Sequence, residues 1–149
     1  MTQRYGMEIR AATSAEAPGL AVLLAEAGHP VDAQDLAVRL GALRQAPAAA
    51  LMAWQWGPPS GLVVLHWYPG LFSPRPIAQI TTLLVAEQDR RRGVGRMLVK
   101  AAAQAARAAG CNDMELAVPD DAPDMAGFCE ATGFARAGLR FTRSLRRRS

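Results

Sequence analysis

The chain has 149 residues and a formal net charge of +4, with half of its residues hydrophobic and a fifth charged. A chain of this length can bury about 68–70% of its unfolded surface, so we expect one domain over residues 1–149. Its apolar runs stay well below the roughly 18 residues of a membrane span, and its start lacks the apolar core of a signal peptide. These features exclude a membrane protein and favour a cytoplasmic one.

The cysteines and the arginines narrow the classes further. Cys111 and Cys129 have no metal-ligand spacing around them, so we expect free thiols and no metal site. The net positive charge is compatible with nucleic acid as a partner, but the arginines gather in residues 90–96 and 140–148. The first group is explained below, and the second ends in a basic tail, 145–149, that we expect to be mobile. Nucleic-acid binding therefore remains a lesser alternative.

The first third of the chain predicts a strand and two helices, over residues 7–12, 14–27 and 32–44. Thr13 and Glu16 have the spacing of a capping box, which begins the first helix. Asp32 caps the second helix. Two apolar strands then form a hairpin over residues 48–56 and 62–68, because a Gly/Pro-rich turn separates them.

The middle of the chain predicts a strand, a polar turn and a long helix. The apolar run from Ile80 to Val85 has strand length, and a Pro/Gly loop over residues 69–76 precedes it. Gly93 and Gly95 open a helix over residues 94–109, and Gly110 ends it. Its apolar face is expected to hold Val94, Met97, Leu98, Ala101, Ala102 and Ala105. The remaining elements are a strand over 114–118, a helix capped by Asp124, and one or two strands within 134–144.

The turn before the long helix has the composition of an anion site. The first N–H groups of a helix have no intrahelical acceptor, and the helix dipole adds about half a positive charge there. Glycines allow a ligand to approach the main chain, and Arg90, Arg91 and Arg92 add cations. A dinucleotide fingerprint is excluded because Gly93 and Gly95 have no third glycine at the required spacing. The turn therefore predicts phosphate binding.

The order of the elements predicts an α/β (α+β) fold. Strands alternate with helices, so we expect a single mixed sheet of six to seven strands with helices on both faces.

Two motifs follow one another along the chain. The first is Arg90-x-x-Gly93-x-Gly95 at the head of the long helix. The second is FCEATGF, residues 128–134. Together they resemble the GNAT superfamily of acetyl-CoA-dependent N-acyltransferases, which often has an apolar-Tyr-Glu-x-x-Gly-Phe stretch in the second place. The resemblance covers roughly residues 77–135 closely and the two predicted N-terminal helices loosely. The alternative is a generic strand–glycine–helix turn without a cofactor.

The resemblance implies acetyl-CoA as the cosubstrate and no metal. Main-chain N–H groups from about Arg91 to Arg96 would hold the pyrophosphate. The pantetheine arm would pair with the strand at Leu83–Val85, where an N–H polarises the thioester carbonyl. The implied cofactor-binding residues are Leu83, Leu84, Val85, Arg90, Arg91, Arg92, Gly93, Val94, Gly95 and Arg96.

The catalytic positions depart from the family pattern. Gln79 stands where many members have a glutamate base, and it can hold a water but cannot take a proton. Cys129 stands where many members have a tyrosine acid, so it is either a thiol acid or a small buried filler. His66 is the best remaining titratable base, and its alternative is a hydrogen-bonded, half-buried histidine.

The expected function is therefore N-acetylation by acetyl-CoA of a primary amine, carried by a small molecule or a peptide, through direct attack. The resemblance places the acceptor beside the first two helices and the loop 69–76. Gln79 and Cys129 also leave open an acyl-CoA-binding module with little or no catalysis. A homodimer is compatible with the resemblance.

Overall fold

The computed structural model describes residues 6–147. The chain divides into two compact units, Met1–Leu116 and Ala117–Ser149. The predicted mobile tail lies partly outside the described residues, since residues 148 and 149 are not among them. Within residues 6–147 no helix has the length and apolar character needed to cross a membrane.

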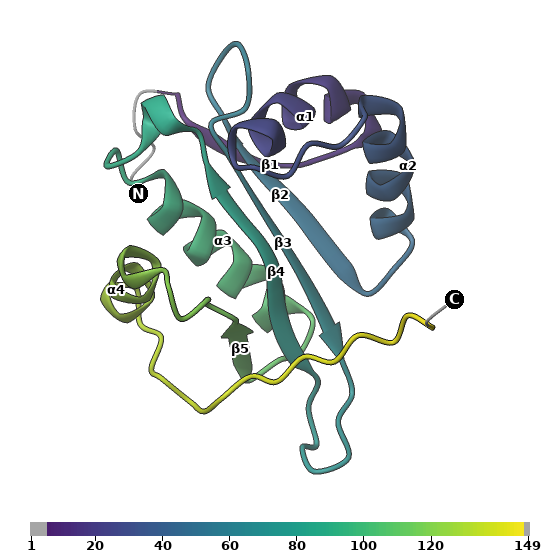
Figure 1. Ribbon diagram of the computed structural model, residues 1–149, viewed down its shortest axis with the longest axis vertical. Helices are drawn as coiled ribbons and strands as arrows, with labels where there is room; N and C mark the ends of the chain where they lie inside the picture. Colours follow the sequence, from purple (N-terminus) through teal and green to yellow (C-terminus); the bar gives the residue numbers. More distant parts are fainter. Residues whose placement is uncertain (1–5, 148–149) are drawn as a thin grey trace. The chain divides into compact units, whose positions relative to one another are not determined.

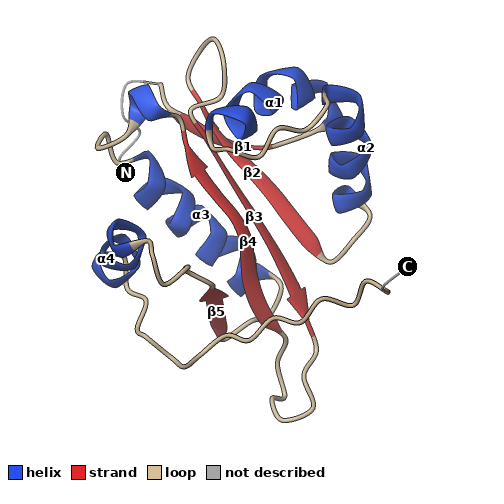
Figure 2. Cartoon of the chain, viewed as in Figure 1, coloured by secondary structure: helices blue, strands red, loops and turns tan. Residues whose placement is uncertain are grey.

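The first unit is one mixed sheet with helices (Figures 1 and 2). Its strands lie in the order β1-β2-β3-β4-β5, antiparallel except for the parallel pair β4 and β5. Its elements are β1 (Glu8–Ala11), the 3-10 helix η1 (Ser14–Glu16), α1 (Ala17–Glu26), α2 (Ala33–Arg44), β2 (Ala48–Trp54), β3 (Gly61–Tyr68), β4 (Ile77–Val85), the 3-10 helix η2 (Glu87–Asp89), α3 (Val94–Ala108) and β5 (Asp113–Leu116).

Local capping explains where the first two helices begin. Glu16 Oε1 accepts the Thr13 backbone N–H at 2.8 Å, and the Thr13 side chain accepts the Ala15 N–H, so the predicted capping box is confirmed. The box starts a 3-10 turn, and the α-helix proper starts at Ala17. Pro18 explains this division, because it has no N–H and fits only the first turn of an α-helix. Asp32 caps α2 through its carboxylate, as predicted.

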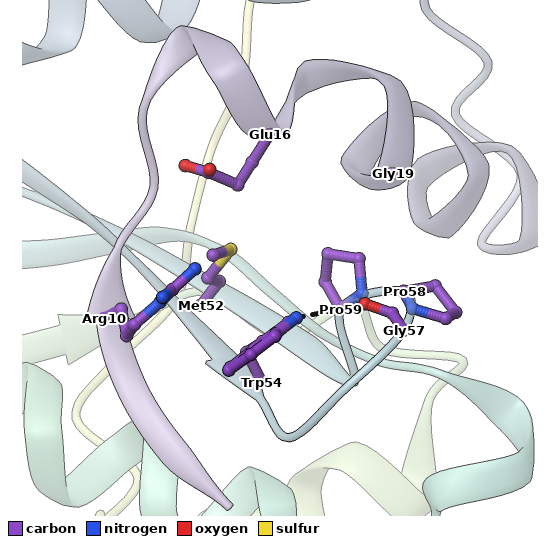
Figure 3. Close-up of a pocket in the computed structure, with 8 residues that line it drawn as sticks. All are labelled: Arg10, Glu16, Gly19, Met52, Trp54, Gly57, Pro58 and Pro59. Atoms are coloured by element: carbon purple, nitrogen blue, oxygen red, sulfur yellow. Dashed lines mark hydrogen bonds between the residues drawn. The ribbon is translucent and has the colours of Figure 1, made fainter.

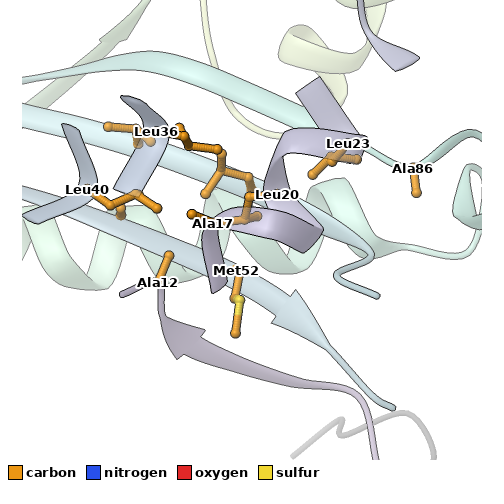
Figure 4. Packing of buried hydrophobic residues seen from close by; sticks show 11 residues of the cluster. Ala12, Ala17, Leu20, Leu23, Leu36, Leu40, Met52 and Ala86 are labelled. Carbon is orange, nitrogen blue, oxygen red and sulfur yellow. The ribbon is translucent and has the colours of Figure 1, made fainter. Parts of the chain in front are cut away.

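Helices cover both faces of the sheet, as predicted. On one face α1 and α2 pack on β2 and β3, with Leu20, Leu40 and Met52 at most 2% exposed (Figure 4). Leu62 and Val64 of β3 belong to this cluster, so the alternating Gly61 points to the other face. There a Cβ at Gly61 would lie 2.8 Å from Leu98 Cδ1, which shows how closely α3 packs on β3.

The buried face of α3 is only partly the predicted one. The sequence indicated a stripe that included Met97, Ala101 and Ala105, and these are half-buried. The residues that α3 buries are Val94, Leu98, Val99, Ala102 and Ala106. Val94, Leu98 and Ala102 were predicted correctly, and the buried face is rotated toward Val99 and Ala106.

The second unit corrects the predicted strand number. After α4 (Pro123–Ala131) the described residues contain no strand, so the sheet has five strands and the prediction of six to seven was wrong. Leu139, Phe141 and Leu145 alternate with polar residues, but each is 86–87% exposed. An alternating pattern of apolar and polar residues indicates strand propensity. A strand also needs a neighbouring strand to pair with and a face that it can bury.

The predicted cap of α4 was also wrong. Its N-cap is Ala122, no side chain of the described chain caps it, and Asp124 lies in the first turn instead. Pro123 accounts for the shift, because proline is favoured at the first helical position.

Candidate functional site

The turn between β4 and α3 is built from backbone conformations that few residues adopt. The Ala86 N–H donates to the Ser60 carbonyl at 2.8 Å, which joins the end of β4 to the start of β3. Asp89 closes the short helix η2, and Arg90 is extended with φ −65° and ψ 150°. Arg91 then has φ +66° and Gly93 has φ +82°. The chain therefore reverses direction within four residues and enters α3.

The start of α3 presents backbone donors. Gly93 is its N-cap, and no side chain in residues 6–147 caps the helix. The first intrahelical bond runs from the Met97 N–H to the Gly93 carbonyl at 3.1 Å, so the N–H groups of Val94 and Gly95 precede the helical ladder. Together with the helix dipole, this arrangement can bind an anion.

The arginines of the turn have different surroundings. Arg92 Nη1 lies 2.9 Å from Asp89 Oδ1, and Asp89 is buried. Arg90 and Arg91 are exposed. Asp89 thus balances part of the charge of the turn through its contact with Arg92. Among the described residues, Arg91 alone combines a side chain with a positive φ, a conformation that costs about 1–2 kcal/mol. Such strain is often retained at functional sites.

One edge of β4 is open beside this turn. β4 pairs with β3 along its whole length, but its pairing with β5 covers only Ile77–Ile80. In the described sheet, residues 81–85 therefore have no strand partner on the β5 side. The register with β3 shifts here, since Val64 faces Thr82 while Leu65 faces Ile80. Thr81 is the extra residue of a β-bulge, which bends the strand and increases its twist where pairing to β5 ends.

The structure brings two of the predicted catalytic residues together. His66 and Gln79 are direct cross-strand partners in β3 and β4, so their side chains share one face of the sheet. Both are half-buried. Tyr68 lies two residues beyond His66 on the same face, is 41% exposed and faces Ile77.

The third predicted catalytic residue, Cys129, lies on α4 in the second unit. It is a free thiol and is buried. Burial raises the pKa of the Cys129 thiol, and the charge of Glu130 adds to that effect. A raised pKa keeps the thiol protonated at neutral pH and makes it a weaker proton donor. This property favours the filler interpretation over the acid.

A separate pocket lies near β1, and none of these residues lines it (Figure 3). It has a volume of about 260 Å³, below the range of about 300–1,000 Å³ typical of ligand sites. The Arg10 guanidinium stacks over the Trp54 ring at 4.4 Å, and Trp54 Nε1 donates to the Gly57 carbonyl at 3.0 Å. On the far wall, a Cβ at Gly19 would lie 2.8 Å from Pro59 Cδ. These contacts describe a packed junction of α1 with the β2–β3 turn.

Metal ligands do not gather in the described chain. Within residues 6–147 no group of three or more His, Cys, Asp or Glu side chains could hold a metal ion.

A comparison with protein families decides the class. The model of the acetyltransferase (GNAT) family matches residues 18–134, most of the chain. The chain belongs to the GNAT acetyltransferase family. The match contains both sequence motifs and the β4–α3 turn, and members of this family generally use acetyl-CoA. Among curated proteins, none matches the chain in sequence.

Solved structures share the GNAT fold over nearly the whole chain. A protein of Agrobacterium tumefaciens strain C58 assigned as an acetyltransferase is 27% identical, with a TM-score of 0.83, covering 92% of this chain and 99% of its own. An acetyltransferase of Trypanosoma brucei is 20% identical, with a TM-score of 0.80 and coverages of 93% and 99%. Glucosamine-6-phosphate N-acetyltransferase of Arabidopsis thaliana is 13% identical, with a TM-score of 0.81 and coverages of 94% and 99%.

Two features of this candidate site were not predicted from the sequence. The spacing of Asp89 and Arg92 was a usable signal, because opposite charges three residues apart can pair in a turn or helix. The bulge at Thr81 had no signal, since Thr81 and Thr82 both suit a regular strand.

Proposed function

We propose that this GNAT protein transfers the acetyl group of acetyl-CoA to a primary amine, carried by a small molecule or a peptide, by direct attack. The observation that carries the proposal is the start of α3, which no side chain of the described residues caps, beside residues 81–85 of β4, which have no strand partner on the β5 side of the described sheet. The first supplies donors for phosphate, and the second supplies backbone for an extended arm. A strand–helix turn without a cofactor would not require an open edge on β4.

The residues of the first unit fit coenzyme A. Backbone N–H groups of residues 91–96 would hold the pyrophosphate, with the exposed side chains of Arg90 and Arg91 as cations. The backbone of Leu83–Val85 would receive the pantetheine arm as an added strand. Acetyl-CoA supplies an activated acetyl thioester, whose carbonyl an N–H near Leu83 or Leu84 would polarise.

The chain must also deprotonate the acceptor. A primary amine of lysine-like pKa is neutral in only about one molecule in a few thousand at pH 7, so a base is required. His66 is proposed as this base, and the neighbouring Gln79 would hold a water between His66 and the amine. The resemblance suggests Cys129 as the residue that protonates the leaving thiolate, but its raised pKa makes it a poor donor and favours the filler interpretation.

The acceptor class is supported by relatives of the same fold. One solved neighbour is a glucosamine-6-phosphate N-acetyltransferase, and another is an aminoglycoside acetyltransferase from a soil metagenome, 18% identical with a TM-score of 0.79. Both names describe small amine-bearing molecules. In this chain Glu26 and His29 are exposed between α1 and α2, whereas the Asp32 carboxylate is occupied in capping α2. Glu26 is therefore the better candidate for binding an ammonium group.

The second candidate function is an acyl-CoA-binding module with little catalysis, favoured by Gln79 and by the raised pKa of Cys129. A thiol-release assay with acetyl-CoA and a panel of amino sugars, aminoglycosides, amino acids and peptide N-termini separates the two. We expect release of free coenzyme A above the hydrolytic background with at least one class of amine. Tight acetyl-CoA binding without turnover on any amine would contradict catalysis and support the module.

A further inference from the structure

Asp89 is a buried carboxylate inside a turn that is otherwise strongly basic. Only 9% of the residue is exposed, and its Oδ1 lies 2.9 Å from Arg92 Nη1. Its own N–H donates to the Ala86 carbonyl at 2.9 Å, so its backbone is fixed to the end of β4. The Arg92 side chain is 59% exposed. The pair thus joins a fixed, buried anion to a cation on the surface.

The ion pair spans the strained part of the turn. Between its two members lie the extended Arg90 and the positive-φ Arg91, and Gly93 follows directly. A left-handed arginine persists only where its surroundings hold the backbone in place. The contact between Asp89 and Arg92 closes a short ring around these residues. It therefore opposes relaxation of Arg91 to a commoner conformation.

The negative charge of the Asp89 carboxylate should weaken the binding of phosphate groups at this turn. A carboxylate within about one Debye length of roughly 10 Å repels a polyanionic ligand, and here it also neutralises one of the three adjacent arginines. If charge alone determined affinity, removing Asp89 would strengthen coenzyme A binding. A geometric role predicts the opposite result.

We propose that Asp89 is a positioning residue for the cofactor. By holding Arg92, it fixes residues 90–93 in the conformation that presents the N–H groups at the start of α3. Arg92 acts in this clamp as a part of the fold, and Arg90 and Arg91 are the cations that meet the ligand. This inference rests on the proposed function, because it assumes that the turn binds coenzyme A.

Calorimetric titration with coenzyme A tests the clamp, with Asp89→Ala and a matched control, Glu87→Ala. Both substitutions remove one negative charge from η2, but Glu87 is exposed and Asp89 is buried. We expect Asp89→Ala to raise the Kd about tenfold, the effect of losing one charge-assisted hydrogen bond. Glu87→Ala should leave the Kd unchanged or lower it. An Asp89→Ala protein that binds as tightly as wild type, or more tightly, overturns the inference.

Arg92→Gln supplies a second, independent reading. It breaks the same pair from the exposed side and changes the net charge in the opposite direction. The clamp predicts that Arg92→Gln and Asp89→Ala weaken binding by similar factors, and that the double variant is no weaker than either. Additive losses in the double variant would contradict a shared role. Partial unfolding would lower the binding stoichiometry, because only folded protein binds the ligand. A stoichiometry near one with a raised Kd therefore indicates a loss of positioning rather than unfolding.

Titration of the wild type and of Asp89→Ala distinguishes failure of the clamp from failure of the proposed function. A wild-type chain that does not bind coenzyme A refutes the proposed function. A wild-type chain that binds it, with Asp89→Ala unchanged, refutes only the clamp.

Discussion

At the scale of single residues, Arg91 combines two opposing demands. Its backbone lies in the left-handed region, which favours glycine, while its exposed side chain adds a cation beside the start of α3. A residue chosen for local stability alone would be glycine. The strain is therefore expected to be offset by a contribution of the charge to ligand binding.

Arg91→Gly separates these demands. It relieves about 1–2 kcal/mol of backbone strain and adds about 0.5–1 kcal/mol of chain entropy in the unfolded state, so the free energy of unfolding should stay equal or rise slightly. The Kd for coenzyme A should rise several-fold. Urea unfolding and calorimetry measure the two quantities.

Arg90→Gly is the matched control for Arg91→Gly. It removes the same charge at a residue with φ −65°, where no strain is relieved. It should lower the free energy of unfolding by about 0.5–1 kcal/mol. Equal stability changes in the two variants would contradict the strain at Arg91.

His66 carries the prediction about proton transfer. His66→Asn keeps a polar side chain opposite Gln79 but removes the base, so kcat should fall by about 10²–10⁴-fold. A normal rate in His66→Asn would exclude the role.

At the scale of elements, features that depend on neighbouring residues could be predicted from the sequence, whereas pairing between distant strands could not. The capping box at Thr13, the Asp32 cap and the glycine-headed helix α3 each depend on neighbours within a few residues, and each was predicted. The strand expected near Phe141 failed because a strand exists only with a partner edge. The bulge at Thr81 also depends on two strands, so one strand's sequence could not reveal it.

Packing between elements gives a stability prediction with opposite signs at two glycines. A Cβ at Gly61 would lie 2.8 Å from Leu98 Cδ1 and 2.9 Å from the Leu84 carbonyl oxygen. Gly61→Ala should therefore lower the free energy of unfolding by about 1–3 kcal/mol. A Cβ at Gly41, inside α2, meets nothing within 4 Å in the described structure. Gly41→Ala should raise the free energy of unfolding by about 0.5–1 kcal/mol.

Chemical denaturation of both alanine variants measures these changes. A Gly61→Ala protein as stable as wild type would mean that α3 does not pack on β3 at this distance. A destabilised Gly41→Ala would mean that this face of α2 is covered by another part of the protein.

At the scale of the whole molecule, the proposed cofactor site belongs to the first unit alone. β4, the basic turn and α3 all lie within Met1–Leu116. The proposed base lies in the same sheet, whereas Cys129 lies in the second unit. The proposals for the cofactor and for the base therefore depend on one compact unit.

The family could be inferred from the sequence because two motifs stood in the right order, and the family comparison confirmed it. The acceptor could not be inferred, because the resemblance places it beside α1, α2 and the loop 69–76 rather than at one motif. In this chain those elements offer Glu26, His29 and an exposed loop tip at Leu71 and Phe72, which do not define one substrate.

The most direct test is the affinity of the full chain for coenzyme A, measured by calorimetry in wild type and in Gly95→Glu. Gly95 lies inside the first turn of α3, so a glutamate there places bulk and negative charge among the donors without changing a positive-φ residue. We predict saturable binding by wild type and a Kd at least about a hundredfold higher in Gly95→Glu, as expected for a lost charge-assisted contact and added repulsion. Absence of binding in the wild type, or equal affinity in Gly95→Glu, would contradict a coenzyme A site at the start of α3.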